Sequence, residues 1–78
     1  MRKKRKYTVI TFHTTSAAMA MEKYCMQQGI PGRLIPVPRE LSAGCGLAWR
    51  IPVEDYELSR ERFLKANLEH EQVAEVML

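Results

Sequence analysis

Apolar and polar residues alternate along three short segments of the chain, as they do in β-strands that bury one face. In the first segment, Ile10 and Phe12 fall on one face and Tyr7 and Val9 on the other. A fourth short apolar segment contains Pro36, which has no N–H to donate to a neighbouring strand, so we expect it at a sheet edge. The predicted strands cover residues 7–12, 33–37, 47–51 and 72–78.

Apolar positions spaced three and four residues apart predict two helices between these strands. The first begins after the hydroxyl side chains of residues 14–16, which can cap a helix, and ends at Gly29, which suits a left-handed stop. Its apolar stripe includes Cys25. The second begins after Pro52, an acceptable residue at a helix start, and ends near Asn67.

The order strand, helix, strand, strand, helix, strand predicts an α+β fold. Specifically, we expect a ferredoxin-like βαββαβ sandwich with a four-stranded antiparallel sheet, strand order 4-1-3-2, and both helices on one face. This topology brings the end of the first strand, the start of the first helix and the start of the third strand to one pole. Cys45, which precedes the third strand, is therefore expected near residues 13–16.

The composition limits the class of protein. A chain of 78 residues with 46% apolar and 27% charged side chains forms one globular domain. It has no run of about 18 apolar residues, and polar residues interrupt the segment that follows the basic N-terminus, so neither a membrane span nor a signal peptide is predicted. We expect a cytoplasmic protein with no membrane contact.

The net charge of +3 comes from the N-terminus. Five of the twelve basic residues lie at positions 2–6, so the remaining seven face nine acidic residues, a balance of −2. We divide the chain into a basic, flexible arm over residues 1–6 and a single domain over residues 7–78. Because the domain itself is not basic, a nucleic acid is not the expected partner.

Cys45 is the main candidate for chemistry, since it stands between Gly44 and Gly46 in the loop before the third strand. The N-terminus of a helix offers N–H donors and partial positive charge, which stabilise a thiolate, so we expect this thiol to be more acidic than a free one. Arg39 in the same loop would add to the effect and Glu40 would oppose it. The alternative is a small residue that merely fits a turn.

The other candidate ligands and bases are weaker. Cys25 lies at helical spacing from apolar residues, so we expect it in the core rather than as a resolving thiol. The two cysteines and two histidines lack the spacing of a metal site, and no metal or other cofactor is expected. His13 could act as a base for Cys45, although a histidine at a strand end more often packs or faces water.

Several segments together resemble the bacterial selenium/sulfur carrier protein-like family, also called DUF3343. The similarity runs from Tyr7 onward and is most specific in the combination of Leu-Ile-Pro-Val-Pro-Arg-Glu with a later Gly-Cys-Gly. The quoted pieces are residues 7–12, 14–17, 22–23, 29–31, 33–40 and 44–48. His13 departs from the Ser or Thr expected before the Thr-Thr pair, and the basic arm is not part of the pattern.

The resemblance implies that Cys45 carries sulfur or selenium as a persulfide or selenopersulfide. The donor would be an enzyme such as a cysteine desulfurase, the acceptor another protein, and the chain a carrier or accessory protein rather than an independent enzyme. Thr14, Thr15 and Ser16 would supply hydrogen bonds, and Gly44 and Gly46 would leave the partner a path to the sulfur.

Other functions stay open from the sequence. A small regulatory, metabolite-binding or protein-binding module would keep the same pole without thiol chemistry. Residues 2–6 could also bind a nucleic acid, or they could form a disordered, solvated terminus without a partner. A homodimer through the second sheet edge or the exposed sheet face is also open.

Overall fold

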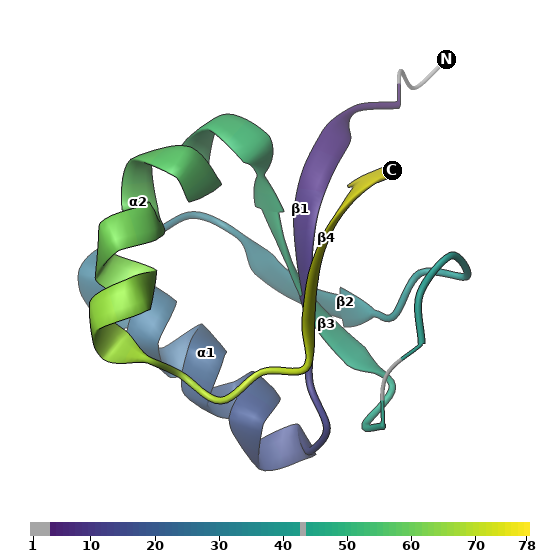
Figure 1. The fold of residues 1–78 in the computed structure, drawn as a ribbon, viewed down its shortest axis with the longest axis horizontal. Helices are drawn as coiled ribbons and strands as arrows, with labels where there is room; N and C mark the ends of the chain where they lie inside the picture. Colours follow the sequence, from purple (N-terminus) through teal and green to yellow (C-terminus); the bar gives the residue numbers. More distant parts are fainter. Residues whose placement is uncertain (1–3, 43) are drawn as a thin grey trace.

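The structure, a computed structural model, describes residues 4–42 and 44–78. It contains one antiparallel sheet in the order β2-β3-β1-β4, with both helices on one face and the loop between β2 and β3 on the other (Figure 1). This confirms the predicted ferredoxin-like α+β fold and its strand order. The elements are β1 (Lys6–Thr11), α1 (Thr15–Gln28), β2 (Arg33–Pro36), β3 (Leu47–Pro52), α2 (Val53–Ala66) and β4 (Gln72–Met77).

The register of the sheet separates the apolar residues into two layers. Ile10 lies opposite Trp49 of β3, and both face the helices, whereas Val9 faces away. A slip of one residue would exchange these faces, so the alternating pattern fixes the pairing. The helix-side core consists of Ile10, Phe12, Ala17, Ala18, Met21, Cys25, Ile30, Trp49 and Ile51.

The face turned away from the helices, here called the outer sheet face, has a smaller core. Val9, Ala48 and Val76 are buried there, and Leu41 from the β2–β3 loop packs against them. The strand residues on this face follow from the pairing, because antiparallel partners share a face. They are Tyr7, Val9, Thr11, Arg33, Ile35, Ala48, Arg50, Pro52, Gln72, Ala74 and Val76.

Both helices end as the sequence predicts. The Thr14 hydroxyl accepts a hydrogen bond from the Ala17 N–H at 3.1 Å and caps α1, and Gly29 ends that helix with φ of 67°. Asn67 ends α2 in the left-handed conformation, with φ of 49°. Arg62 of α2 donates to the Gln28 carbonyl oxygen at 3.0 Å, which ties the helices together. Among the described residues, neither helix has the length and hydropathy needed to span a bilayer.

The sheet begins one residue before the predicted domain boundary. Lys6 pairs with Met77, and Arg5 exchanges two backbone hydrogen bonds with Leu78 at 2.9 Å each. These partners exist because β4 runs the full length of β1. Residues 1–3 of the expected flexible arm lie outside the described residues.

Candidate thiol site

Cys45 lies against the turn that connects β1 to α1, as the topology predicts. Its backbone N–H donates to the Phe12 carbonyl oxygen at 3.4 Å. Gly44 lies against the same turn so closely that a Cβ there would be 2.8 Å from the His13 carbonyl oxygen. Residues 44 and 45 are therefore docked on the turn between β1 and α1, one residue before the α1 cap at Thr14.

The Cys45 sulfur is half-buried and packs against the helix-side core. The Leu47 N–H donates to Sγ at 3.4 Å, and Sγ also lies 3.6 Å from the Leu47 carbonyl oxygen, within reach of its S–H. Between them, Gly46 has φ of 75°, which glycine adopts without steric cost and which turns the chain back on itself. The local fold thus directs a backbone donor at the sulfur.

Among the described residues, the hydroxyl groups at the start of α1 do not hydrogen-bond to the Cys45 sulfur as the sequence led us to expect. The Thr14 hydroxyl caps its own helix. Thr15 and Ser16 are exposed, and in the described part of the chain no side-chain hydrogen bond joins either to Cys45. Sequence reasoning missed Leu47 because its contribution is a backbone N–H; the glycine between it and the cysteine is the signal that could have indicated the turn.

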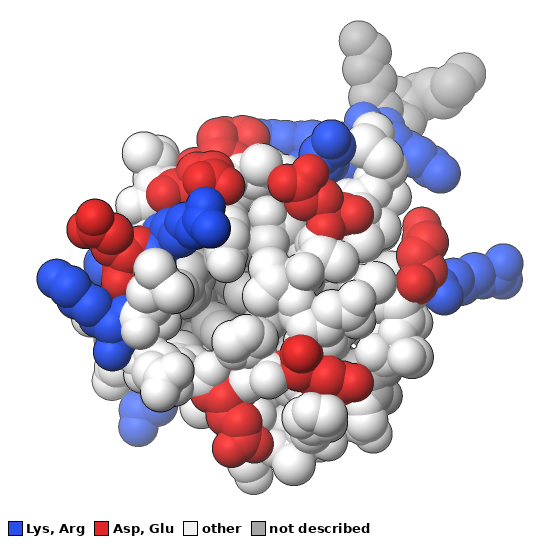
Figure 2. Space-filling view, viewed as in Figure 1, with Lys and Arg blue, Asp and Glu red and all other residues white. Residues whose placement is uncertain are grey.

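His13 and Arg39 do not contact the sulfur among the described interactions. The exposed His13 ring turns toward β4, with Nδ1 3.7 Å from Glu71 Oε1. Arg39 and Glu40 are both exposed in the β2–β3 loop. Figure 2 shows an acidic and a basic side chain projecting from this part of the molecule into solvent. No contact with the sulfur among the described residues therefore supports the base role for His13 or a direct role for Arg39.

The two glycines beside Cys45 differ in their surroundings. Gly44 is packed against the His13 backbone, so its missing side chain permits a close approach of two chain segments rather than an opening. A Cβ on Gly46 would meet nothing within 4 Å. The space beside Gly46 is therefore open, whereas the His13 backbone fills the space beside Gly44.

Cys25 is fully buried in α1, which confirms the core interpretation. Burial raises the pKa of its thiol to about 11, against a smaller lowering effect of Arg62. Its sulfur lies 3.8 Å from Met21 Sδ. At neutral pH this side chain is an apolar, protonated thiol. Elsewhere in residues 4–42 and 44–78, no three His, Cys, Asp or Glu side chains come together as a metal site would require.

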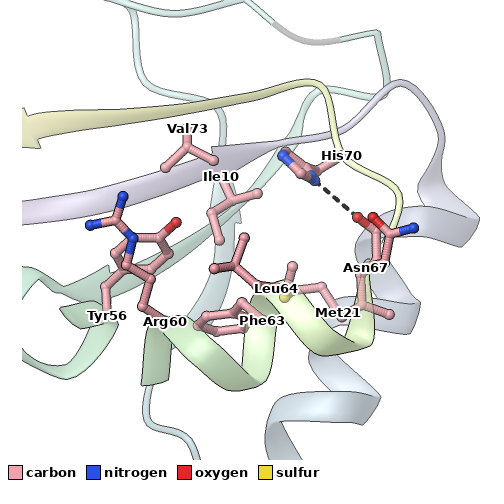
Figure 3. Close-up of a pocket in the computed structure, with 10 residues that line it drawn as sticks. Ile10, Met21, Tyr56, Arg60, Phe63, Leu64, Asn67, His70 and Val73 are labelled. Atoms are coloured by element: carbon pink, nitrogen blue, oxygen red, sulfur yellow. Dashed lines mark hydrogen bonds between the residues drawn. The ribbon is translucent and has the colours of Figure 1, made fainter. Parts of the chain in front are cut away.

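A pocket of about 140 Å³ lies between α2 and the sheet, apart from Cys45. Figure 3 shows Tyr56, Phe63 and Leu64 of α2 on one side of it and Ile10 and Val73 of the sheet on the other. None of the site residues predicted from sequence lines it. The pocket is an apolar gap left where α2 does not cover β4, with Arg60, Asn67 and His70 at its polar positions.

The fold and this pole define a small α+β domain that presents one half-buried free thiol beside its central strand. The family described as Putative Se/S carrier protein-like matches residues 6–75, and the chain belongs to that family. The resemblance found in the sequence is thereby confirmed over almost the whole domain, including Cys45. No curated protein and no solved structure matches this chain.

Proposed function

We propose that this protein accepts a sulfur or selenium atom on Cys45 as a persulfide or selenopersulfide and passes it from a donor enzyme to an acceptor protein. Membership of the Se/S carrier-like family supports the role. The observation that carries the assignment to this residue is the Leu47 N–H directed at the half-buried Cys45 sulfur. A backbone N–H at this position can donate to the thiolate, the nucleophile, when sulfur is exchanged at Cys45.

The loading step is a thiol–disulfide-type exchange that needs no external oxidant. The Cys45 thiolate attacks the terminal sulfur of a persulfide on the donor. A new S–S bond forms at Cys45, the donor's S–S bond breaks, and the donor cysteine leaves as a thiolate. For delivery, a nucleophile of the acceptor attacks the terminal atom and Cys45 leaves as a thiolate. Selenium would follow the same steps.

The surroundings of Cys45 suit both halves of this exchange. Packing against the helix-side core shields the sulfur from one side, and the open space at Gly46 leaves a direction from which a larger protein can approach. Residues 14–16, at the start of α1, would add positive potential at short range. Arg39 would form an ion pair with the anionic cargo or with the partner's surface after the β2–β3 loop moves on binding.

The test is persulfide formation on the purified protein. Incubation with a cysteine desulfurase and cysteine should add the mass of one sulfur atom, and peptide mapping should place it on Cys45. Cys45→Ser should abolish the adduct, and the matched variant Cys25→Ser should retain it. An adduct on Cys25, or none on the folded protein, would contradict the proposal and favour a binding module without thiol chemistry.

A further inference from the structure

The outer sheet face gathers arginines around one aromatic ring. The Arg50 guanidinium carbon lies 4.5 Å from the centre of the Tyr7 ring, and that of Arg5 lies 5.8 Å from it. Arg33 of β2 is the direct partner of Arg50 in β3, so its side chain starts from the same face. Arg5 and Arg50 thus lie over the Tyr7 ring, and Arg33 lies on the same face beside Arg50, one strand further from Tyr7.

These charges are poorly balanced on this face. None of the strand residues assigned to it by the register is acidic. Arg5 reaches over to Glu54 at the start of α2. In residues 4–42 and 44–78, by contrast, no ion pair neutralises Arg33 or Arg50. Like charges placed directly opposite each other destabilise a sheet. The repulsion between Arg33 and Arg50 therefore lowers the stability of the sheet, and an anionic ligand would relieve it.

The charge count along the sequence concealed this arrangement. The excess acidic residues of the domain lie from residue 54 onward, mostly on α2 and around β4. Figure 2 shows acidic and basic side chains intermixed over the α2 side of the molecule. The fold therefore sorts a domain with a balance of −2 into a mixed helix layer and a sheet face that is basic.

We propose that the outer sheet face binds single-stranded nucleic acid, with backbone phosphates at Arg33 and Arg50 and a base stacked at Tyr7. Guanidinium groups match phosphate geometry, and an aromatic ring among them provides the stacking surface that nucleic-acid-binding sheets use. An acidic protein would form ion pairs with the arginines but would not require an aromatic ring for stacking. A duplex would keep its bases stacked inside and out of reach.

Tyr7 and Leu41 both pack against the cluster of Val9, Ala48 and Val76 on this face. Leu41 comes from the β2–β3 loop, and Tyr7 from the start of β1. Cys45 contacts the residue that follows the opposite end of β1. A bound strand would therefore leave the thiol uncovered, and this inference is independent of the carrier role.

The experiment measures fluorescence anisotropy of labelled oligouridylate and oligothymidylate of about 15 nucleotides at about 50 mM salt. The double variant R33Q/R50Q should weaken binding roughly tenfold or more and make its salt dependence shallower. The matched control K23Q/R60Q removes the same charge from the helix layer and should leave affinity within about twofold. Circular dichroism checks that each variant is folded.

The role of the ring is tested separately. Tyr7→Phe keeps a stacking surface and should retain affinity, whereas Tyr7→Leu keeps apolar packing without stacking and should weaken binding about fivefold or more. A chain lacking residues 2–4 distinguishes the face from the basic N-terminus, because its remaining binding should still depend on Arg33 and Arg50.

Four results would overturn the proposal. These are no binding by the intact protein, equal losses in R33Q/R50Q and K23Q/R60Q, unchanged affinity in Tyr7→Leu, or displacement of the oligonucleotide by polyglutamate at an equal charge concentration. The last result would identify an unspecific basic surface that fits acidic proteins equally well.

Discussion

Replacing Gly44 with alanine tests whether the thiol site depends on close packing against the β1–α1 turn. The added Cβ would lie 2.8 Å from the His13 carbonyl oxygen and 3.3 Å from its Cα. Both contacts are with backbone, which cannot move aside as a side-chain tip would. The loop must retreat by roughly half an ångström to reach ordinary van der Waals separation. The 3.4 Å hydrogen bond from Cys45 to Phe12 is already long and should break.

The expected cost combines two effects. Overpacking of this kind costs about 1–3 kcal/mol, and loss of one backbone hydrogen bond contributes about 1 kcal/mol, part of which the retreat already includes. We therefore expect Gly44→Ala to lower the free energy of unfolding by about 2 kcal/mol. Since a domain of this size is stable by only about 4–12 kcal/mol, the variant should remain folded.

Urea unfolding followed by the fluorescence of the single, buried Trp49 gives the stability change. The matched control is Gly46→Asn, because a Cβ at position 46 meets nothing within 4 Å and asparagine tolerates a φ of 75°. It should cost less than about 1 kcal/mol. Equal stability of Gly44→Ala and the natural protein, or a larger loss in Gly46→Asn, would refute the packing argument.

Three further outcomes are expected. Thr14→Ala should lower the free energy of unfolding by about 1 kcal/mol through loss of the α1 cap, while Thr14→Ser keeps most of it, as urea titrations would show. The Cys25 pKa of about 11 exceeds its ordinary value of 9.0, so its contribution to stability is complete below pH 9.0 and is lost as pH rises through about 11. Over that range the natural protein should lose roughly 2–3 kcal/mol more than Cys25→Ala, and parallel pH profiles of the two would contradict this. Iodoacetamide should alkylate Cys45 in the folded protein and Cys25 only after unfolding, and mass analysis that finds early labelling of Cys25 would argue against its burial.

The fold was predictable because three strands carry a period-2 pattern, the fourth is a short apolar segment with an edge proline, and each helix ends at a residue that suits a helix stop. Val9 and Ile10 face opposite layers as their alternation predicts, and Gly29 and Asn67 end the helices in the left-handed conformation that these residues tolerate. The start of β1 at Lys6, one residue before the predicted strand, has a different cause. Nothing in the basic N-terminal segment indicates a strand, and Lys6 joins β1 only because β4 supplies a partner at Met77.

The site was predictable only as far as topology determines it. Strand order and chain direction are enough to bring Cys45 to the β1–α1 turn. The group that contacts its sulfur is set by the backbone conformation of Gly46, and Leu47 contributes through its N–H, which no residue identity encodes. His13 illustrates the same limit, because its partner Glu71 lies at the other end of the chain.

The two proposed sites, the thiol and the basic part of the outer sheet face, lie near opposite ends of β1. Tyr7 and its arginines lie near the start of the strand, and Cys45 contacts the residue after its end. Five residues of extended chain separate them by roughly 15 Å, and the two groups also belong to different layers, since the sulfur packs on the helix side. A ligand on the outer sheet face would therefore neither shield the thiol nor change its contacts. Because of this separation, Arg33 and Arg50 variants should load sulfur normally and Cys45→Ser should bind oligonucleotide normally, so failure of either proposal leaves the other standing.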